Sequence, residues 1–125
     1  MMIDLHPTKC NLCGDKVIYI SNAEIYGRQY GSGYCYYCTS CGAYVGTHIP
    51  RPREALGILA NNEMKEWKIK CHNLFDPLWK NKTKSRGKLY SALADQMGIP
   101  ARQCHFGYFD LEALKKAYEI LKTWN

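Results

Sequence analysis

Two short cysteine motifs of the same form constrain the fold of this chain more than any other feature. Residues 10–14 (CNLCG) and 38–42 (CTSCG) are both C-x-x-C-G units, and 24 residues lie between Cys13 and Cys38. Zinc takes four thiolates at about 2.3 Å, and two such turns supply them. The glycine after each second cysteine permits the tight backbone that the turn needs. We therefore predict one structural Zn²⁺ held by Cys10, Cys13, Cys38 and Cys41, with no coordination position open to a substrate.

Cys35 offers an alternative pairing, because Cys35 and Cys38 also have C-x-x-C spacing. We assign Cys38 and Cys41 to the metal because Gly42 matches Gly14, and because Cys35 alternates with tyrosines as a strand residue does. The chain has seven cysteines, and an odd count argues against complete disulfide pairing. A redox C-x-x-C motif normally occurs once, beside a βαβ unit, so the repeated motif favours metal.

The segment around these motifs has the composition of a small β-structure. Strand-like runs at 17–20, 23–26, 34–37 and 43–46 are rich in tyrosine and β-branched residues, and glycines separate them as in hairpins. Seven of the ten tyrosines fall in the first 44 residues. They either form the thin core of the ribbon or stack on bases. We predict a zinc ribbon of short antiparallel strands over residues 10–50.

From residue 53 onward, helical periodicity replaces the strand pattern. Met64, Trp67, Cys71, Leu74 and Leu78 form an apolar stripe at helical spacing. We predict a helix that Asn62 caps and that ends near Asp76, because Pro77 disfavours helical backbone in the residue before it. Asp76 and Pro77 then read as the start of a further short helix.

Two more helices follow a polar loop. Leu89, Tyr90, Leu93, Ala94 and Met97 form one stripe, which Gly98 and Pro100 end. Asp110 caps the last helix, whose apolar face carries Leu111, Leu114, Tyr118 and Leu121. We therefore expect an α+β fold in a single domain, residues 1–125, with the zinc ribbon packed on three to four helices of the part 53–125.

The charge is moderately basic, with 17 basic and 11 acidic residues and a formal net charge of +6. Four thiolates and one Zn²⁺ bring this value to +4. Five cations without an acid lie between residues 80 and 88: Lys80, Lys82, Lys84, Arg86 and Lys88. Arg51 and Arg53 add two more after the ribbon. These residues are candidates to contact a phosphate backbone or an acidic protein surface, and a solvated loop explains them equally well.

The histidines provide the only catalytic candidates. His72 and Asp76 are four residues apart on one helix face, so the carboxylate is placed to orient a general base. With His105 and Asp110 the pair is also a candidate for a second metal site. The plainer interpretation makes Cys71 and Cys104 core residues and leaves His48, His72 and His105 partly buried. There is no H-E-x-x-H, nucleophile motif or glycine-rich phosphate loop.

No run of residues approaches the roughly 18 consecutive apolar residues that a membrane span needs. The first residues lack the basic and apolar segments of a signal peptide. We expect a cytoplasmic protein with no membrane partner.

Several ordered motifs over about residues 10–120 resemble a family of small zinc-finger-containing proteins of bacteriophages and prophages, a domain of unknown function. The motifs are residues 38–48 (CTSCGAYVGTH), 56–60 (LGILA), 71–79 (CHNLFDPLW), 90–94 (YSALA) and 104–110 (CHFGYFD). The resemblance implies zinc at the four cysteines and a phage-type origin. The family pattern carries residues matching His72, Asp76, Trp79 and His105, and it often has Asp where this chain has Asn61.

Three functions are consistent with these features. The first is a non-enzymatic accessory protein that binds nucleic acid or a host nucleoprotein through the cations of 80–88 with Arg51 and Arg53. The second is an inhibitor of a host defence or replication factor. The third is a small hydrolase or nuclease that uses His72, Asp76 and His105. We favour binding over catalysis, because zinc ribbons usually serve as scaffolds and no catalytic signature stands out.

Overall fold

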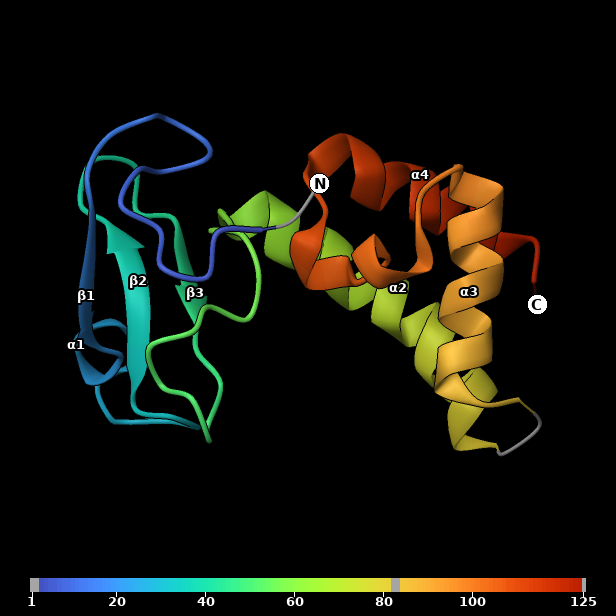
Figure 1. Cartoon of the computed structure of the whole chain (residues 1–125), viewed down its shortest axis with the longest axis horizontal. Helices are drawn as coiled ribbons and strands as arrows, with labels where there is room; N and C mark the ends of the chain where they lie inside the picture. Colours follow the sequence, from blue (N-terminus) through green and yellow to red (C-terminus); the bar gives the residue numbers. More distant parts are fainter. Residues whose placement is uncertain (1–2, 82–83, 125) are drawn as a thin grey trace. The chain divides into compact units, whose positions relative to one another are not determined.

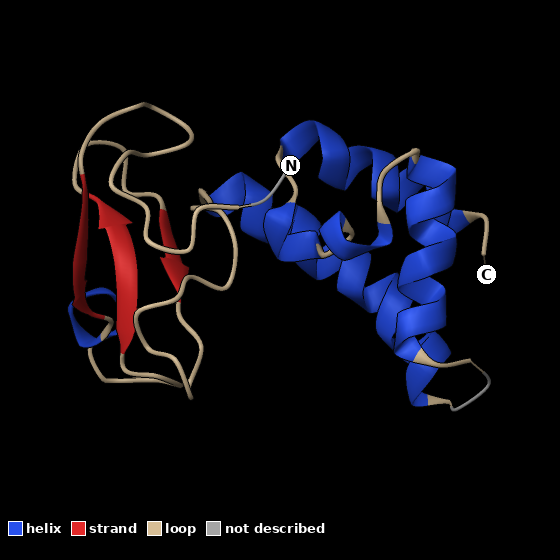
Figure 2. Ribbon diagram, in the orientation of Figure 1, coloured by secondary structure: helices blue, strands red, loops and turns tan. Residues whose placement is uncertain are grey.

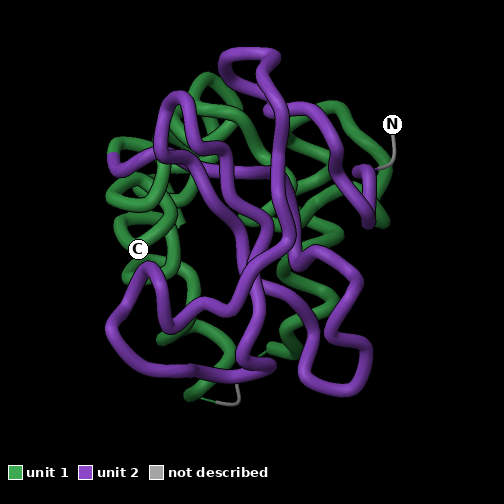
Figure 3. The backbone as a smooth tube through the Cα atoms, turned by 90° about the vertical axis from the view of Figure 1, so that its left-hand side faces the viewer, with its two compact units in different colours: residues 1, 63–125 green, residues 2–62 purple. Residues whose placement is uncertain are grey.

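The computed structural model describes residues 3–81 and 84–124, and it divides the chain into two compact units (Figure 3). Residues 3–62 form the first, which we call the ribbon unit. Residues 63–124 form the second, which we call the helical unit. Strands occur in the ribbon unit and long helices in the helical unit (Figure 2). The fold class is therefore α+β, as the sequence predicts.

The ribbon unit contains a three-stranded antiparallel sheet in the order β1-β2-β3 (Figure 1). The strands are β1 (Val17–Ser21), β2 (Tyr34–Cys38) and β3 (Tyr44–Gly46). In the register of the sheet, Val17 lies opposite Cys38 and Tyr36 lies opposite Val45. Three of the four predicted strand runs are confirmed, with ends that differ by one residue.

The prediction of a strand at 23–26 is wrong, because this segment forms the short helix α1 (Ala23–Tyr26). Asn22 determines the local structure through three bonds across the loop. Its side chain donates to the carbonyl of Tyr30 at 2.8 Å and accepts from the Tyr30 N–H at 3.1 Å, and its own N–H donates to the carbonyl of Gly33. The chain must turn within this closed loop, so it cannot continue as an extended strand. Gly27 ends the turn at a φ of 82°.

The core of the ribbon unit is small and includes part of the segment after β3. It consists of Cys10, Val17, Tyr36, Cys38, Ala43, Val45, Ala55 and Leu59, with Tyr19 packed against it. Single bridges pair Tyr44 with Ala60 and Thr47 with Ala55. Residues 53–61 therefore belong to the ribbon unit, although their composition groups them with the helices. Of the ribbon tyrosines, Tyr36 is a core residue, whereas Tyr26, Tyr30 and Tyr34 are exposed.

The helical unit is built from α2 (Asn62–Lys80), α3 (Arg86–Met97) and α4 (Leu111–Lys122), with the 3-10 turns η1 (Ala101–Gln103) and η2 (Phe106–Tyr108) before α4. The predicted end of α3 at Gly98 and the predicted cap of α4 are confirmed. Gly98 ends α3 at a φ of 73°, and at the start of this helix Ser85, a cap not predicted from the sequence, accepts through Oγ from the N–H of Lys88. Asp110 Oδ1 accepts from the N–H of Ala113 at 2.9 Å.

Two predictions about α2 are wrong. The helix begins at Asn62, so the N-cap position falls on Asn61. The helix also continues through Pro77 to Lys80, and Asn81 donates to the Pro77 carbonyl at 3.1 Å. Pro77 is exposed, and its missing N–H removes one helical hydrogen bond while the flanking turns still form. Asp76 is thus a residue of the helix interior and not a cap, which frees its carboxylate for side-chain partners.

Apolar side chains from all three long helices and η2 form the core of the helical unit. Phe75, Leu93, Phe106, Leu114 and Leu121 are each less than 2% exposed. The ring centroids of Phe75 and Phe106 are 5.3 Å apart, and Cys71 Sγ donates to the Leu114 carbonyl at 3.4 Å. Burial raises the pKa of both Cys71 and Cys104 to about 11, so both thiols stay protonated and act as core residues. No helix in the described residues is long and apolar enough to span a bilayer.

Phe75→Ala is expected to destabilise the helical unit by about 3–5 kcal/mol, because it opens a cavity beside Tyr90 and Phe106. Urea unfolding followed by the helical circular dichroism signal measures the change. Ile69→Ala is the control, since Ile69 lies on the same helix and is 60% exposed. It should shift the free energy of unfolding by no more than about 0.5 kcal/mol. Equal effects of the two substitutions would contradict the assignment of the core.

Candidate functional site

The two cysteine motifs fold into knuckles with the same hydrogen bonds. In the first, Gly14 N–H donates to the Cys10 carbonyl at 2.9 Å, and Cys10 N–H donates to the Asp15 carbonyl at 2.7 Å. In the second, Gly42 N–H donates to the Cys38 carbonyl and Cys38 N–H donates to the Ala43 carbonyl, both at 2.9 Å. Gly14 and Gly42 have φ values of 81° and 82°, a left-handed conformation that favours glycine. The repeated C-x-x-C-G sequence therefore produces a repeated structure.

The four sulfur atoms of these knuckles converge on one point. Cys10 and Cys41 Sγ are 3.6 Å apart, Cys13 and Cys38 Sγ are 3.5 Å apart, and all four lie within 4.8 Å of one another. A tetrahedron of thiolates at about 2.3 Å from zinc has edges of about 3.8 Å, so the donor set fits one zinc ion. Four protein ligands close the coordination sphere, which makes the site structural.

Backbone N–H groups and neighbouring thiols give the four cysteines different acidities. Leu12 N–H points at Cys10 Sγ at a distance of 3.4 Å. Hydrogen bonds from the Cys41 N–H, the Cys13 thiol and the Ser40 N–H outweigh burial and lower the pKa of Cys38 to about 7. The Asp15 N–H lowers the pKa of Cys13, but the neighbouring thiols and burial outweigh it and raise this pKa to about 12. A zinc ligand must be a thiolate, so Cys38 is placed to ionise before Cys13 when the metal binds.

Cys35 is not part of this group. It lies in β2 opposite Ile20 and Gly46, it is buried, and its sulfur does not join the four that converge. Among the described residues, no other set of three or more His, Cys, Asp or Glu side chains meets the same distance limit. The assignment of Cys38 and Cys41 over Cys35 is therefore confirmed.

Cys38→Ser is expected to abolish zinc binding, whereas Cys35→Ser should retain about one zinc per chain. The two cysteines lie on the same strand three residues apart, so the pair separates metal ligation from burial. Zinc content of the purified proteins, measured by mass spectrometry, gives the result. Loss of the metal from Cys35→Ser with retention in Cys38→Ser would contradict the site.

In the helical unit, Asp76 connects His72 and Trp79 on one face of α2. Its Oδ1 accepts from Trp79 Nε1 at 3.1 Å and lies 3.3 Å from His72 Nδ1. Partial burial raises the pKa of Asp76, but the Trp79 and His72 contacts outweigh it, and the net pKa lies below the usual value. The sequence predicts the His72–Asp76 pair, and the structure adds Trp79, three residues further along the same helix.

His105 does not join this pair. Its ring lies against Tyr90 and Tyr108, with centroid distances of 5.2 and 4.8 Å, whereas the His72 ring lies against Phe106. The ligand atoms of His72, Asp76 and His105 do not all lie within 4.8 Å of one another. Asp110, the fourth member of the predicted second metal site, accepts the capping bond of α4. The four residues of the predicted second metal site therefore do not come together: His72 and Asp76 form a pair, and His105 lies apart from it.

Of the described cations of residues 80–88, two lie over aromatic rings. Lys80 Nζ is 5.7 Å and Arg86 Cζ 5.6 Å from the Trp79 ring centroid, and Arg86 is also 5.7 Å from that of Tyr90. Lys84, Arg86 and Lys88 are exposed. Lys82 lies outside the described residues. Sequence reasoning found the cations but missed these aromatic partners, although Tyr90 follows Arg86 by four residues, a helical spacing.

The two arginines of the ribbon unit have local partners. Arg51 Nε lies 2.8 Å from Glu54 Oε1, so its charge is compensated. Arg53 lies over the Tyr19 ring at 5.0 Å, and Tyr19 stacks on Tyr34 at 5.2 Å. Of the two, Arg53 is the better placed for an anionic partner.

Arg86→Gln is expected to raise the pKa of His105. Burial, and then the Arg86 charge, hold this pKa below its usual value, so removing the charge removes one of the two causes. The folded protein binds the His105 proton less readily than the unfolded chain does, and stability therefore falls as the pH drops through about 6.5. That loss should be smaller in the variant. An NMR titration of the His105 ring measures the shift, and an unchanged or lower pKa would contradict the contact.

Comparison with known proteins agrees with this geometry. The sequence model of a family described as a zinc-finger-containing domain matches residues 6–124, which covers both units. No curated protein and no solved structure matches the chain.

Proposed function

We propose that this chain, which belongs to DUF3268, the family of zinc-finger-containing domains, binds single-stranded nucleic acid without acting on it chemically. The zinc stabilises the ribbon unit, and the cations at the start of α3 supply the binding surface. The observation that carries this proposal is the pairing of Lys80 and Arg86 with Trp79.

Phosphates and bases need different partners, and this surface offers both. Lysine and arginine neutralise backbone phosphates and release counterions, which gives affinity without sequence preference. Aromatic rings beside them stack on unpaired bases, each stacked base contributing about 1–3 kcal/mol. Residues 80–88 contain no acid that would repel a phosphate. Asp76, the nearby carboxylate, is engaged by Trp79 and His72.

Catalysis has less support. The His72–Asp76 pair is one element of a general base, in which the carboxylate orients the imidazole. His105 faces Tyr90 and Tyr108 instead of completing a catalytic group. We therefore place binding ahead of a hydrolase or nuclease.

Lys80→Gln/Arg86→Gln is expected to weaken binding of a fluorescent single-stranded oligonucleotide and to lower its salt dependence. Each phosphate contact contributes about 0.7 to the slope of log affinity against log salt for single strands, so loss of two contacts lowers the slope by about 1.4. Fluorescence anisotropy at several salt concentrations measures both quantities.

Arg102→Gln/Lys115→Gln is the matched control, because it removes two exposed cations of the same unit away from the start of α3. It should leave the slope close to that of the wild type. Salt-insensitive binding by the wild type, or equal losses in the two double variants, would contradict the proposed surface. If the chain binds a nucleoprotein but does not bind the free strand, its target is the protein and not the nucleic acid.

A further inference from the structure

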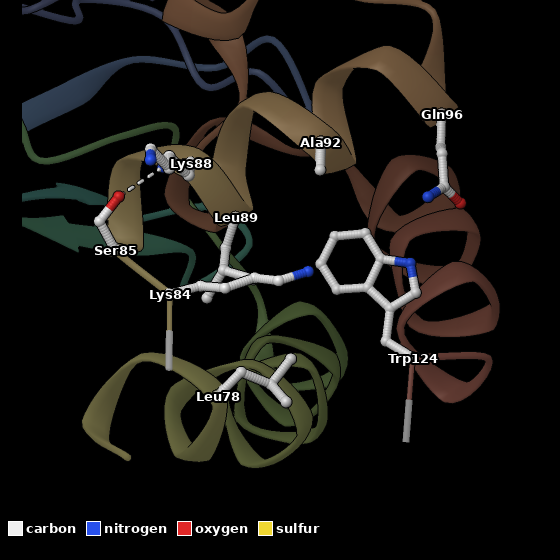
Figure 4. A pocket seen from close by; sticks show the side chains of 8 residues that line it. All are labelled: Leu78, Lys84, Ser85, Lys88, Leu89, Ala92, Gln96 and Trp124. Atoms are coloured by element: carbon white, nitrogen blue, oxygen red, sulfur yellow. Dashed lines mark hydrogen bonds between the residues drawn. The ribbon is translucent and has the colours of Figure 1, made fainter. Parts of the chain in front are cut away.

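A pocket of about 840 Å³ lies beside α3 in the helical unit (Figure 4). This volume is within the roughly 300–1,000 Å³ that small-molecule sites occupy. Its lining comes from the end of α2, the start and exposed face of α3, and the turn after α4. The lining residues are Leu78, Lys84, Ser85, Lys88, Leu89, Ala92, Gln96 and Trp124.

One end of the pocket is cationic. Lys84 and Lys88 both line it, and the side chain of Lys84 extends toward the indole of Trp124 in Figure 4. No aspartate or glutamate is among the lining residues. Lys84 also directly precedes the capping residue Ser85, so an anion held there meets the positive end of the α3 dipole as well. The polar end therefore selects an anion.

The remainder of the pocket suits a flat ring. The Trp124 indole faces the apolar side chains of Leu78, Leu89 and Ala92, and the Lys84 side chain reaches toward the same ring from the cationic end. Gln96 adds a carboxamide, which both donates and accepts hydrogen bonds and so can pair with the polar edge of a heterocycle. An aromatic ring with polar edges can pair with this carboxamide, whereas an aliphatic chain makes no use of it.

A ligand that satisfies both ends carries a phosphate next to a heterocyclic base. We infer that this pocket binds a nucleoside monophosphate group, with its phosphate between Lys84 and Lys88 and its base against Trp124. The group is either a free mononucleotide or the phosphorylated end of a strand. For a strand end as the ligand, the inference rests on the proposed function, because a strand held by Lys80 and Arg86 would bring its end to the start of α3.

The pocket is distinct from the proposed strand-binding surface. Lys88, Ala92 and Gln96 follow one another at intervals of four residues and form a single stripe along α3, and Lys84 precedes the cap of that helix. Arg86 and Tyr90 lie on a different stripe and contact Trp79 and His105. Substitutions in the pocket can therefore be made without altering Lys80 or Arg86.

The test uses the zinc-loaded full chain and adenosine 5′-monophosphate as the probe. NMR titration should shift the amide signals of Ala92 and Gln96 and the indole signal of Trp124, which Trp124→Phe assigns. Ala92→Phe fills the pocket and should weaken binding at least tenfold, as should Lys88→Gln. Ser91→Phe adds the same ring to the neighbouring exposed residue, which does not line the pocket, and should leave the affinity unchanged.

Oligonucleotides with a 5′-phosphate, a 3′-phosphate or neither distinguish the two sources. If a phosphorylated strand binds more tightly than the unphosphorylated one, and Ala92→Phe abolishes this difference, the pocket binds strand ends. Equal binding of all three strands, with the mononucleotide still bound, assigns it to free nucleotides. Three results would overturn the inference: no shift at the pocket residues, equal effects of Ala92→Phe and Ser91→Phe, or inorganic phosphate binding as tightly as the nucleotide.

The outcomes also separate this inference from the proposed function. If the oligonucleotide binds in the salt-dependent manner expected of Lys80 and Arg86 but the mononucleotide causes no shift, the pocket assignment fails and the proposed function stands. If the mononucleotide binds in the pocket but no oligonucleotide binds with salt dependence, the proposed function fails and the pocket serves free nucleotides.

Discussion

Coordination of one metal ion by four thiolates is the interaction on which the ribbon unit depends. Its strands have five, five and three residues, and its core contains two of the ligands, Cys10 and Cys38. A unit of this size buries too little apolar surface to be stable with a margin. The metal bonds join two knuckles that are far apart in sequence, and the energy of metal binding becomes energy of folding. The three-stranded sheet connects to these knuckles. The loop closed by Asn22 and the segment that contains Ala55 pack onto that sheet.

The helical unit is built around an apolar core, and the proposed binding surfaces lie in this unit. Phe75, Phe106 and Leu114 belong to that core, whereas the four thiols of the metal site lie in the ribbon unit. Ser85 fixes where α3 begins, and this start decides which way the neighbouring cations project. Arg86 lies over Trp79 and Tyr90, whereas Lys84 and Lys88 line the pocket that contains Trp124. One helix start thus presents cations to two separate aromatic environments, and the proposed binding of unpaired nucleotides would use this combination.

Local signals in the sequence predict those parts of the structure that local interactions determine. The zinc ligands follow from spacing and from Gly14 and Gly42, the end of α3 follows from Gly98, and the start of α4 follows from Asp110. The errors arise where a non-local or competing interaction decides. Residues 23–26 have strand-like composition, but the bonds between Asn22 and Tyr30 close a loop around them. Pro77 has the sequence signal of a helix end, yet α2 continues through it to Lys80, and the turn after it closes with the bond from the Asn81 N–H to the Pro77 carbonyl. The Trp79 contact with Asp76 is an i,i+3 contact within α2, and it was missed because the predicted helix ended at Asp76. The approach of Trp124 to α3 depends on tertiary packing, which the periodicity of a single sequence does not report.

The most direct test of separate stabilisation is hydrogen–deuterium exchange before and after zinc removal by a strong chelator. We expect amides of β1, β2 and the two knuckles to lose protection, while the core amides of α3 and α4 keep theirs. That result would show that the metal holds the ribbon unit and that the helical unit rests on its own core. Unchanged protection in the strands after zinc has left, or simultaneous loss of protection in all helices, would contradict the account.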